Sequence, residues 1–187
     1  MLPAVFLDRD GVLIENLSDY VRDWSQVTIL PETITALSSF HHAGFKIVIV
    51  TNQSAIGRGI MTYETAQDIN NRLVKVIEKN GGRIDGVYVC PHKPEDQCNC
   101  RKPQPGLLFQ AARELSLDLS SSWMIGDAWS DLLAGQAAGL REVIMVKTGR
   151  GSKQLLQTRP KELRTFRVHE TISEAISAII ASKSKSF

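Results

Sequence analysis

Short apolar runs alternate along the chain with longer segments in which apolar residues recur every three or four positions. Most of the short runs are rich in β-branched residues, as expected for strands buried on both faces of a sheet. They are Ala4–Leu7, Lys46–Val50, Ile84–Val89, Trp123–Ile125 and Val143–Val146.

The longer segments have the periodicity of amphipathic helices. Pro31 and Pro105 stand at helix starts, and Gly44, Gly81 and Gly139 follow helix ends, where such residues are favoured. Regular alternation of strands and helices predicts an α/β fold with a doubly wound, Rossmann-like parallel sheet covered by helices on both faces. The predicted helices are Glu32–Ala43, Tyr63–Asn80, Gly106–Leu115 and Ser130–Ala138.

The pattern weakens after Gly151. The polar segment Ser152–Arg164 predicts a surface loop, Phe166–Val168 a last strand and Thr171–Ala181 a last helix. We expect Ser182–Phe187 to form a flexible tail. A length of 187 residues suits one domain over residues 1–187.

Composition and charge exclude several classes of protein. The chain is 43% hydrophobic and 22% charged, and its net charge of +2 creates no strong field for nucleic acid or an anionic membrane. No run of about 18 apolar residues is present. The apolar stretch in the opening MLPAVFLDRDG is too short to be the apolar core of a signal peptide. These features predict a soluble, cytoplasmic protein with neither nucleic acid nor membrane as a partner.

Two acids follow the first predicted strand. Residues two apart in an extended chain point the same way, so Asp8 and Asp10 can face one site. Converging carboxylates repel each other unless a cation lies between them, and aspartate is seldom buried unpaired. The alternative is an acidic turn in which Gly11 supplies backbone freedom.

Polar residues also follow the second and fourth predicted strands, at the sheet edge where ligands of such folds bind. Thr51-Asn52-Gln53-Ser54 could hold an anionic oxygen or form a turn. Asp127 directly follows a strand and a glycine, whereas Asp131 in the next helix could merely favour the helix dipole. Arg101 and Lys102 precede the third predicted helix. They are interpreted either as cations that bind phosphate or as a solvated charged pair.

Three cysteines and one histidine cluster within residues 90–100. Cys90, His92, Cys98 and Cys100 give the pattern C-x-H-x5-C-x-C, which suits a closed tetrahedral Zn²⁺ site. A Cys98–Cys100 disulfide would close a very tight ring, and a nucleophilic cysteine would need a separate base. Four protein ligands predict a structural ion. Because Cys100 directly precedes Arg101-Lys102, the zinc is expected to position these cations.

Taken together, these positions resemble the haloacid dehalogenase (HAD) superfamily of phosphohydrolases over about residues 4–150. The resemblance implies that Asp8 attacks phosphorus to form an aspartyl-phosphate and that Asp10 acts as general acid and base. Mg²⁺ would be held by Asp8, by the backbone carbonyl of Asp10 and by Asp127. Thr51 and Lys102 would hold phosphate oxygens. The first superfamily motif is matched by Asp8, Asp10 and Gly11, the second by Thr51 and the third by Lys102. The fourth is matched by Asp127 and Asp131, with Asp131 as a supporting residue.

The stretches CPHKPEDQCNCRKPQPG and TNQSAIGRG are similar to those of the bacterial heptose 1,7-bisphosphate 7-phosphatases and the related histidinol-phosphate phosphatases. We favour the heptose enzymes, which supply precursors of nucleotide-activated heptose, with histidinol phosphate or another small phosphorylated metabolite as the alternative. The family often has Lys where Ala128 stands, which affects one substrate or phosphate contact. About 40 residues separate Gly11 from Thr51, too few for a separate cap domain. The resemblance implies substrate contacts by Asn52, Gln53, Ser54, Arg101 and the loop Asn16–Tyr20, including Asp19 and Tyr20.

Two other classes of protein share part of this pattern. A phosphorylatable receiver module has a doubly wound sheet and an aspartyl-phosphate, but its acceptor lies mid-chain and lacks an acid two residues later. A zinc-dependent nucleic-acid module is poorly supported by a single zinc loop in a nearly neutral chain. We therefore expect a monomeric phosphatase that uses catalytic Mg²⁺ and structural Zn²⁺.

Overall fold

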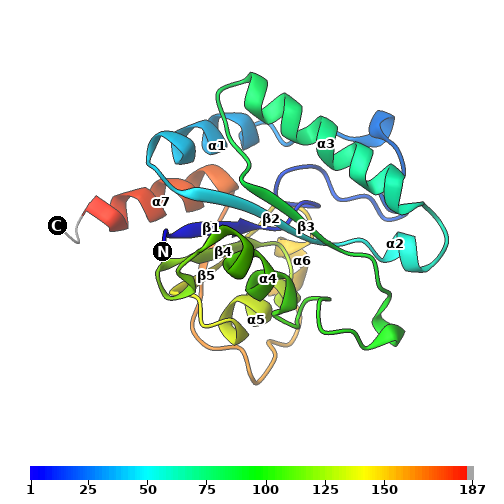
Figure 1. Ribbon diagram of the computed structural model, residues 1–187. Helices are drawn as coiled ribbons and strands as arrows, with labels where there is room; N and C mark the ends of the chain where they lie inside the picture. The colour runs from blue at the N-terminus through cyan, green and yellow to red at the C-terminus, as the bar shows by residue number, and fades with distance from the viewer. Residues whose placement is uncertain (185–187) are drawn as a thin grey trace.

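The computed structural model describes residues 1–184 and shows a six-stranded parallel sheet in the order β3-β2-β1-β4-β5-β6 (Figure 1). This order places the first strand at the centre, between β2 and β4, and confirms the predicted doubly wound sheet. The strands are β1 (Ala4–Leu7), β2 (Lys46–Asn52), β3 (Gly86–Cys90), β4 (Trp123–Gly126), β5 (Glu142–Val146) and β6 (Arg167–His169).

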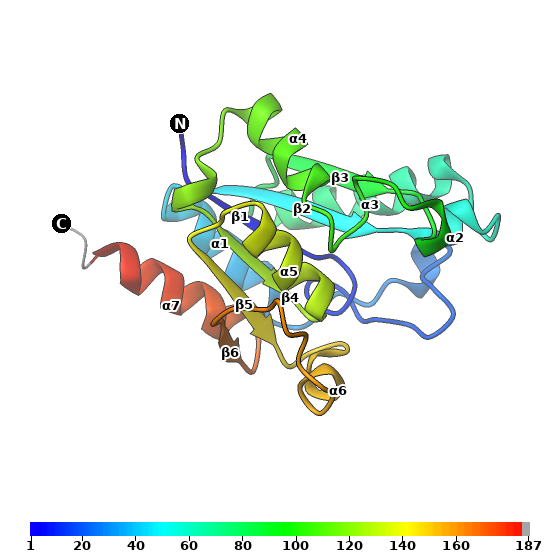
Figure 2. The same ribbon diagram turned by 90° about the horizontal axis from the view of Figure 1, so that it is seen from below.

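Helices cover both faces of the sheet (Figure 2). One face packs against α1 (Thr33–His42), α3 (Tyr63–Lys79) and α7 (Ile172–Ser184), and the other against α4 (Gly106–Leu115) and α5 (Trp129–Ala137). The short helices α2 (Ser54–Gly57) and α6 (Gly151–Leu155) follow β2 and β5. Within residues 1–184, none of the helices has the length and apolar character needed to cross a membrane.

Alternation along each strand divides the apolar core into two layers. In β1, Val5 and Leu7 belong to the layer under α1, α3 and α7, while Ala4 and Phe6 belong to the layer under α4 and α5. All four side chains are fully buried. Burial on both faces explains why the strands are continuous apolar runs rather than alternating ones.

The structure differs from the sequence prediction at several element ends, such as that of β3, which begins at Gly86 rather than Ile84. Strand β2 continues through Thr51 and Asn52, because these residues still pair with β3. The predicted loop Ser152–Arg164 begins inside helix α6, so that prediction is wrong for its first four residues. Helix α7 extends through Ser184, beyond the predicted helix end at Ala181 and into the segment predicted as a tail, and residues 185–187 of that segment lie outside the described part.

Candidate active site and metal centres

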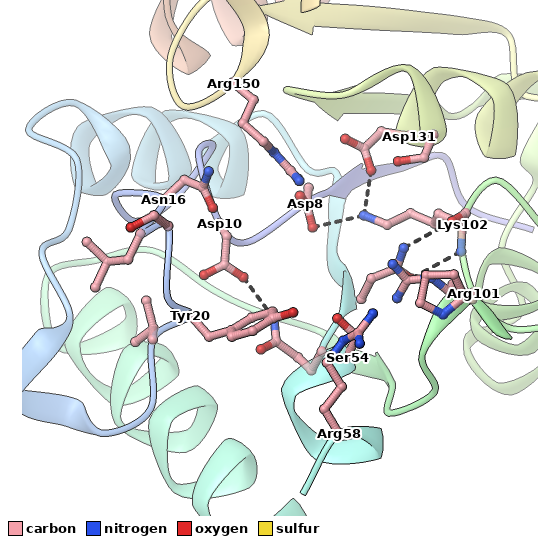
Figure 3. A pocket seen from close by; sticks show the side chains of 17 residues that line it. Asp8, Asp10, Asn16, Tyr20, Ser54, Arg58, Arg101, Lys102, Asp131 and Arg150 are labelled. Carbon is pink, nitrogen blue, oxygen red and sulfur yellow. Dashed lines mark hydrogen bonds and ion pairs between the residues drawn. The ribbon is translucent and has the colours of Figure 1, made fainter. Parts of the chain in front are cut away.

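A cavity of about 470 Å³ opens at the carboxyl edge of the sheet (Figure 3). Thr51 and Asp127 are fully buried behind its wall, and Asp19 is exposed and is not among the residues that line the cavity. Arg58, which lies in the stretch TNQSAIGRG, and Arg150 also line it, although neither was predicted as a site residue. The predicted residues that line the cavity are Asp8, Asp10, Asn16, Tyr20, Asn52, Gln53, Ser54, Arg101, Lys102 and Asp131.

Lys102 is the cation at the base of the cavity. Its Nζ donates to Asp8 Oδ1 at 2.8 Å and to the carbonyl oxygen of Val50 at 2.8 Å, and forms an ion pair with Asp131 Oδ1 at 2.6 Å. Burial alone would lower the pKa of Lys102, but the carboxylates of Asp131 and Asp8 raise it above its usual range. Lys102 therefore stays protonated and fixes the orientation of Asp8, as the dashed lines of Figure 3 show.

Three buried acids meet beside Lys102. Carboxylate oxygens of Asp8, Asp127 and Asp131 all lie within 4.8 Å of one another. Burial and the neighbouring carboxylates of Asp8 and Asp131 raise the pKa of Asp127 to about 7, against the opposing effect of Arg150. Such a cluster favours a hard cation with oxygen ligands, so the donor set fits Mg²⁺.

The hydrogen bonds of Asp131 distinguish it from the other two acids. Its Oδ1 pairs with Lys102, and its Oδ2 accepts from the backbone N–H of Ala128 at 3.0 Å. Both oxygens of Asp131 are thus engaged with buried groups, which places Asp131 to support Lys102. The oxygens of Asp127 are also engaged, but by Arg150, whose side chain is half exposed. Ala128 is buried and does not line the cavity, so at this position the chain adds no side chain to the site.

Asp10 is held apart from the three-acid cluster. Gln53 Nε2 donates to Asp10 Oδ2 at 2.8 Å and to Thr51 Oγ1 at 2.8 Å, so the amide links the ends of β1 and β2. The buried guanidinium of Arg9 grips the same carboxylate. A side chain held in this way suits proton transfer better than metal binding. No sequence pattern indicates that Arg9, which stands between two acids, turns back onto one of them.

Asn52 contacts the main chain of Lys102 with both ends of its amide. Its Nδ2 donates to the carbonyl oxygen of Lys102 at 3.0 Å, and its Oδ1 accepts from the Lys102 N–H at 3.1 Å. Asn52 lines the cavity, as predicted, but these two bonds occupy its polar atoms. These two bonds join the end of β2 to the segment that carries Lys102.

The predicted zinc ligands converge. The three cysteines are free, and the ligand atoms of Cys90, His92, Cys98 and Cys100 lie within 4.8 Å of one another. Sulfur–sulfur distances of 3.1 to 3.6 Å are close to the roughly 3.8 Å expected when Zn–S bonds of about 2.3 Å form a tetrahedron. Hydrogen bonds outweigh burial and lower the pKa of Cys98 to about 7, whereas burial raises that of Cys90. The donor set fits Zn²⁺, and Arg101 Nη1 donates to the His92 carbonyl at 3.1 Å, which ties the loop to the cavity.

Two loops touch backbone to backbone beside Asp127. Gly11 and Gly149 both have positive φ angles, of 89° and 56°. A Cβ atom added to Gly149 would lie 2.4 Å from the Cα of Gly11 and 2.3 Å from Asp127 Oδ2. Thr148 Oγ1 donates to the Gly11 carbonyl at 2.6 Å, and the Arg150 N–H donates to Asp127 Oδ2 at 2.8 Å. The loops after β1, β4 and β5 therefore form one packed unit.

The chain is similar to known phosphatases over most of its length. The HAD-hydrolase-like family model matches residues 99–175. The D-glycero-beta-D-manno-heptose-1,7-bisphosphate 7-phosphatase of Pseudomonas aeruginosa is 35% identical over 87% of this chain and 90% of its own. The protein of the same name from Photorhabdus laumondii is 40% identical over 80% and 82%.

Solved structures agree with this result. The D,D-heptose 1,7-bisphosphate phosphatase of B. bronchiseptica, complexed with magnesium and phosphate, superposes with a TM-score of 0.90 at 31% identity, covering 97% of this chain and 99% of that one. The corresponding enzyme of Burkholderia thailandensis has a TM-score of 0.72 at 29% identity, over 96% and 99%. Both likenesses extend over nearly the whole domain, including the strand ends that carry the site.

Proposed function

The chain belongs to the D-glycero-beta-D-manno-heptose-1,7-bisphosphate 7-phosphatase family of HAD-like phosphatases, and from that premise we propose that it removes the 7-phosphate of a heptose 1,7-bisphosphate. It is a phosphomonoester hydrolase. The observation that carries the proposal is the arrangement of Asp8, Lys102 and Asp131 at the base of a cavity large enough for more than phosphate.

Asp8 is the nucleophile in this proposal. One of its carboxylate oxygens forms a bond to phosphorus as the bond from phosphorus to the sugar oxygen breaks, which gives an aspartyl-phosphate. Lys102 orients the carboxylate before attack and stabilises charge on the phosphoryl oxygens as it shifts, while Thr51, buried behind the cavity wall, accepts from Gln53 and holds that amide in place. Asp131 keeps Lys102 charged and in place.

Asp10 transfers protons in both halves of the reaction. It gives a proton to the leaving sugar oxygen in the first half. In the second half it takes a proton from a water molecule whose oxygen attacks phosphorus, and the bond between phosphorus and Asp8 breaks to release phosphate. Gln53 holds the Asp10 carboxylate for both transfers.

Two metal ions complete the proposal. Asp8, Asp127 and the backbone carbonyl of Asp10 would hold Mg²⁺, which when bound would offset the negative charge of nucleophile and phosphate. Cys90, His92, Cys98 and Cys100 would hold Zn²⁺ as a structural ion. Asn52 and the zinc loop would fix the main chain of Lys102 from two sides.

In this proposal the outer part of the cavity binds the sugar and the phosphate that is not removed. Arg58 and Arg101 line it together with Ser54 and Tyr20, and the two guanidinium groups suit a second phosphate. Asn16 and Tyr20, from the loop after β1, stand where sugar hydroxyls would lie. We propose these residues as the substrate contacts, in place of the exposed Asp19.

A phosphate-release assay tests the proposal. Heptose 1,7-bisphosphate, fructose 1,6-bisphosphate and histidinol phosphate are each incubated with the protein, Mg²⁺ and a colorimetric reagent for phosphate. We expect the highest kcat/KM with the heptose ester. Release from histidinol phosphate alone would refute the heptose assignment, and release from none of the three would refute the phosphatase itself.

A further inference from the structure

Arg9 is a fully buried cation that follows the nucleophile directly in sequence. Its carbonyl oxygen accepts hydrogen bonds from the N–H groups of Leu13 at 2.9 Å and Ile14 at 3.1 Å, so the loop closes around it. Taking a guanidinium out of water is costly, and a well-packed apolar side chain often serves a core as well or better. The partners of the Arg9 side chain therefore indicate what it does.

The guanidinium joins the acid–base residue to helix α3. Its Nε donates to Asp10 Oδ2 at 3.2 Å, and its Nη2 donates to Asp10 Oδ1 at 3.1 Å, so two nitrogens grip one carboxylate. The remaining nitrogen, Nη1, donates to Asn70 Oδ1 at 2.9 Å. Asn70 lies on α3, is buried and does not line the cavity.

We infer that Arg9, anchored by Asn70, is a positioning residue that fixes the Asp10 carboxylate for proton transfer. The inference rests on the proposed function, because it concerns the protonation of the leaving sugar oxygen. A carboxylate that accepts two hydrogen bonds from one planar guanidinium cannot rotate about its last bond without breaking both of them. Asn70 in turn holds the Arg9 guanidinium, so that it does not rotate together with the carboxylate.

The competing interpretation is that Arg9 and Asn70 only hold the loop and α3 together. The two roles differ in how rate depends on the leaving group. A displaced general acid slows departure of a sugar alkoxide, which needs a proton, but hardly slows departure of 2,4-dinitrophenolate, which is a stable anion. The value of kcat/KM reports the steps up to loss of the leaving group. The ratio of kcat/KM for the sugar ester to kcat/KM for the aryl ester therefore measures how much protonation by the general acid contributes to the rate.

The test compares three variants on α3. Asn70→Leu removes the acceptor for Arg9, Asn70→Asp retains an oxygen in its place, and Ile69→Ala loosens the same helix at a buried apolar position. For each variant kcat/KM is measured with the heptose bisphosphate and with 2,4-dinitrophenyl phosphate, and thermal unfolding verifies the fold. Because Asn70→Leu spares Arg9 and Asp10 themselves, a folded protein is expected.

Asn70→Leu should lower kcat/KM for the sugar ester about 10- to 100-fold, which is a part of the roughly 10²- to 10⁴-fold effect of a general acid. The kcat/KM for the aryl ester should change by less than about threefold. Asn70→Asp and Ile69→Ala should keep the unaltered ratio. Equal losses on both esters in Asn70→Leu, or the same loss of ratio in Ile69→Ala or Asn70→Asp, would overturn the role of Arg9. Failure of the unaltered protein to cleave either ester would instead overturn the proposed function.

Discussion

Replacing Asn52 by alanine separates two roles that the site allows for this residue. As a substrate contact, its loss would raise KM; as a clamp on Lys102, its loss would lower kcat and stability. The change removes the bonds of 3.0 and 3.1 Å to the Lys102 carbonyl and N–H, both of which are partly buried. Leaving a buried polar group without its partner costs about 1–3 kcal/mol. Because both bonds are only partly buried, the lower part of that range applies to each, and the two together should cost about 2–4 kcal/mol. In a domain of this size that corresponds to about 5–15 °C in Tm.

The kinetic effect of Asn52→Ala follows from the same bonds. Loss of one well-placed donor to a developing charge costs about 10²- to 10³-fold in kcat, and a loosened Lys102 should forfeit part of this, about tenfold. We expect KM to change by less than about threefold, because uniform substrate binding is not removed. Steady-state phosphate release and thermal unfolding measure the two effects. Asn80→Ala is the matched control, since it removes one exposed side-chain bond to a backbone carbonyl on α3. A raised KM with unaltered kcat and Tm would refute the clamp.

The remaining predictions concern the nucleophile and the two metals. Asp8→Asn should abolish phosphate release and leave the unfolding transition in place, because an amide cannot attack; residual activity above about 1% would count against Asp8 as nucleophile. Cys98→Ser should lose zinc in elemental analysis, lower Tm and lower kcat through Lys102, and unchanged activity without zinc would contradict this link. The raised pKa of Asp127, about 7, means that the metal-free folded protein binds a proton that the unfolded chain releases, so its stability falls as pH rises towards 7. Mg²⁺ must displace that proton at low pH, so it should raise Tm more at about pH 8 than at about pH 6, and an equal rise at both would argue against Asp127 as a ligand.

The strands and long helices were predictable because they obey simple local rules. Helix α4 begins and ends at the predicted Gly106 and Leu115, since a proline before it and an apolar stripe along it are sequence signals. The end of β2 was not predictable, because Thr51 and Asn52 are polar and are held in the strand by pairing with β3. Helix α6 was missed for a similar reason: its Gln154 accepts from the backbone N–H of Trp129, a contact between distant segments.

The site was predictable where residue type implies chemistry, and less so where a fold brings distant side chains together. Acids and small polar residues after strands pointed to the cavity, and the spacing of Cys90 to Cys100 pointed to the metal loop. The contact of Arg9 with Asn70 joins residues 61 positions apart. The entry of Arg150 into the cavity likewise depends on how the loop after β5 packs against Asp127.

The close approach of Gly11 and Gly149 has a consequence for redesigning the substrate range of this phosphatase. Because neither position has room for a Cβ atom beside Asp127, random libraries that include them would yield mostly inactive or unfolded variants. Asn16 and Tyr20, from the loop after β1, line the cavity, whereas neither glycine does. Directed evolution towards other sugar phosphates should therefore diversify that loop and the rim around Arg58, and keep the glycine junction as a fixed frame.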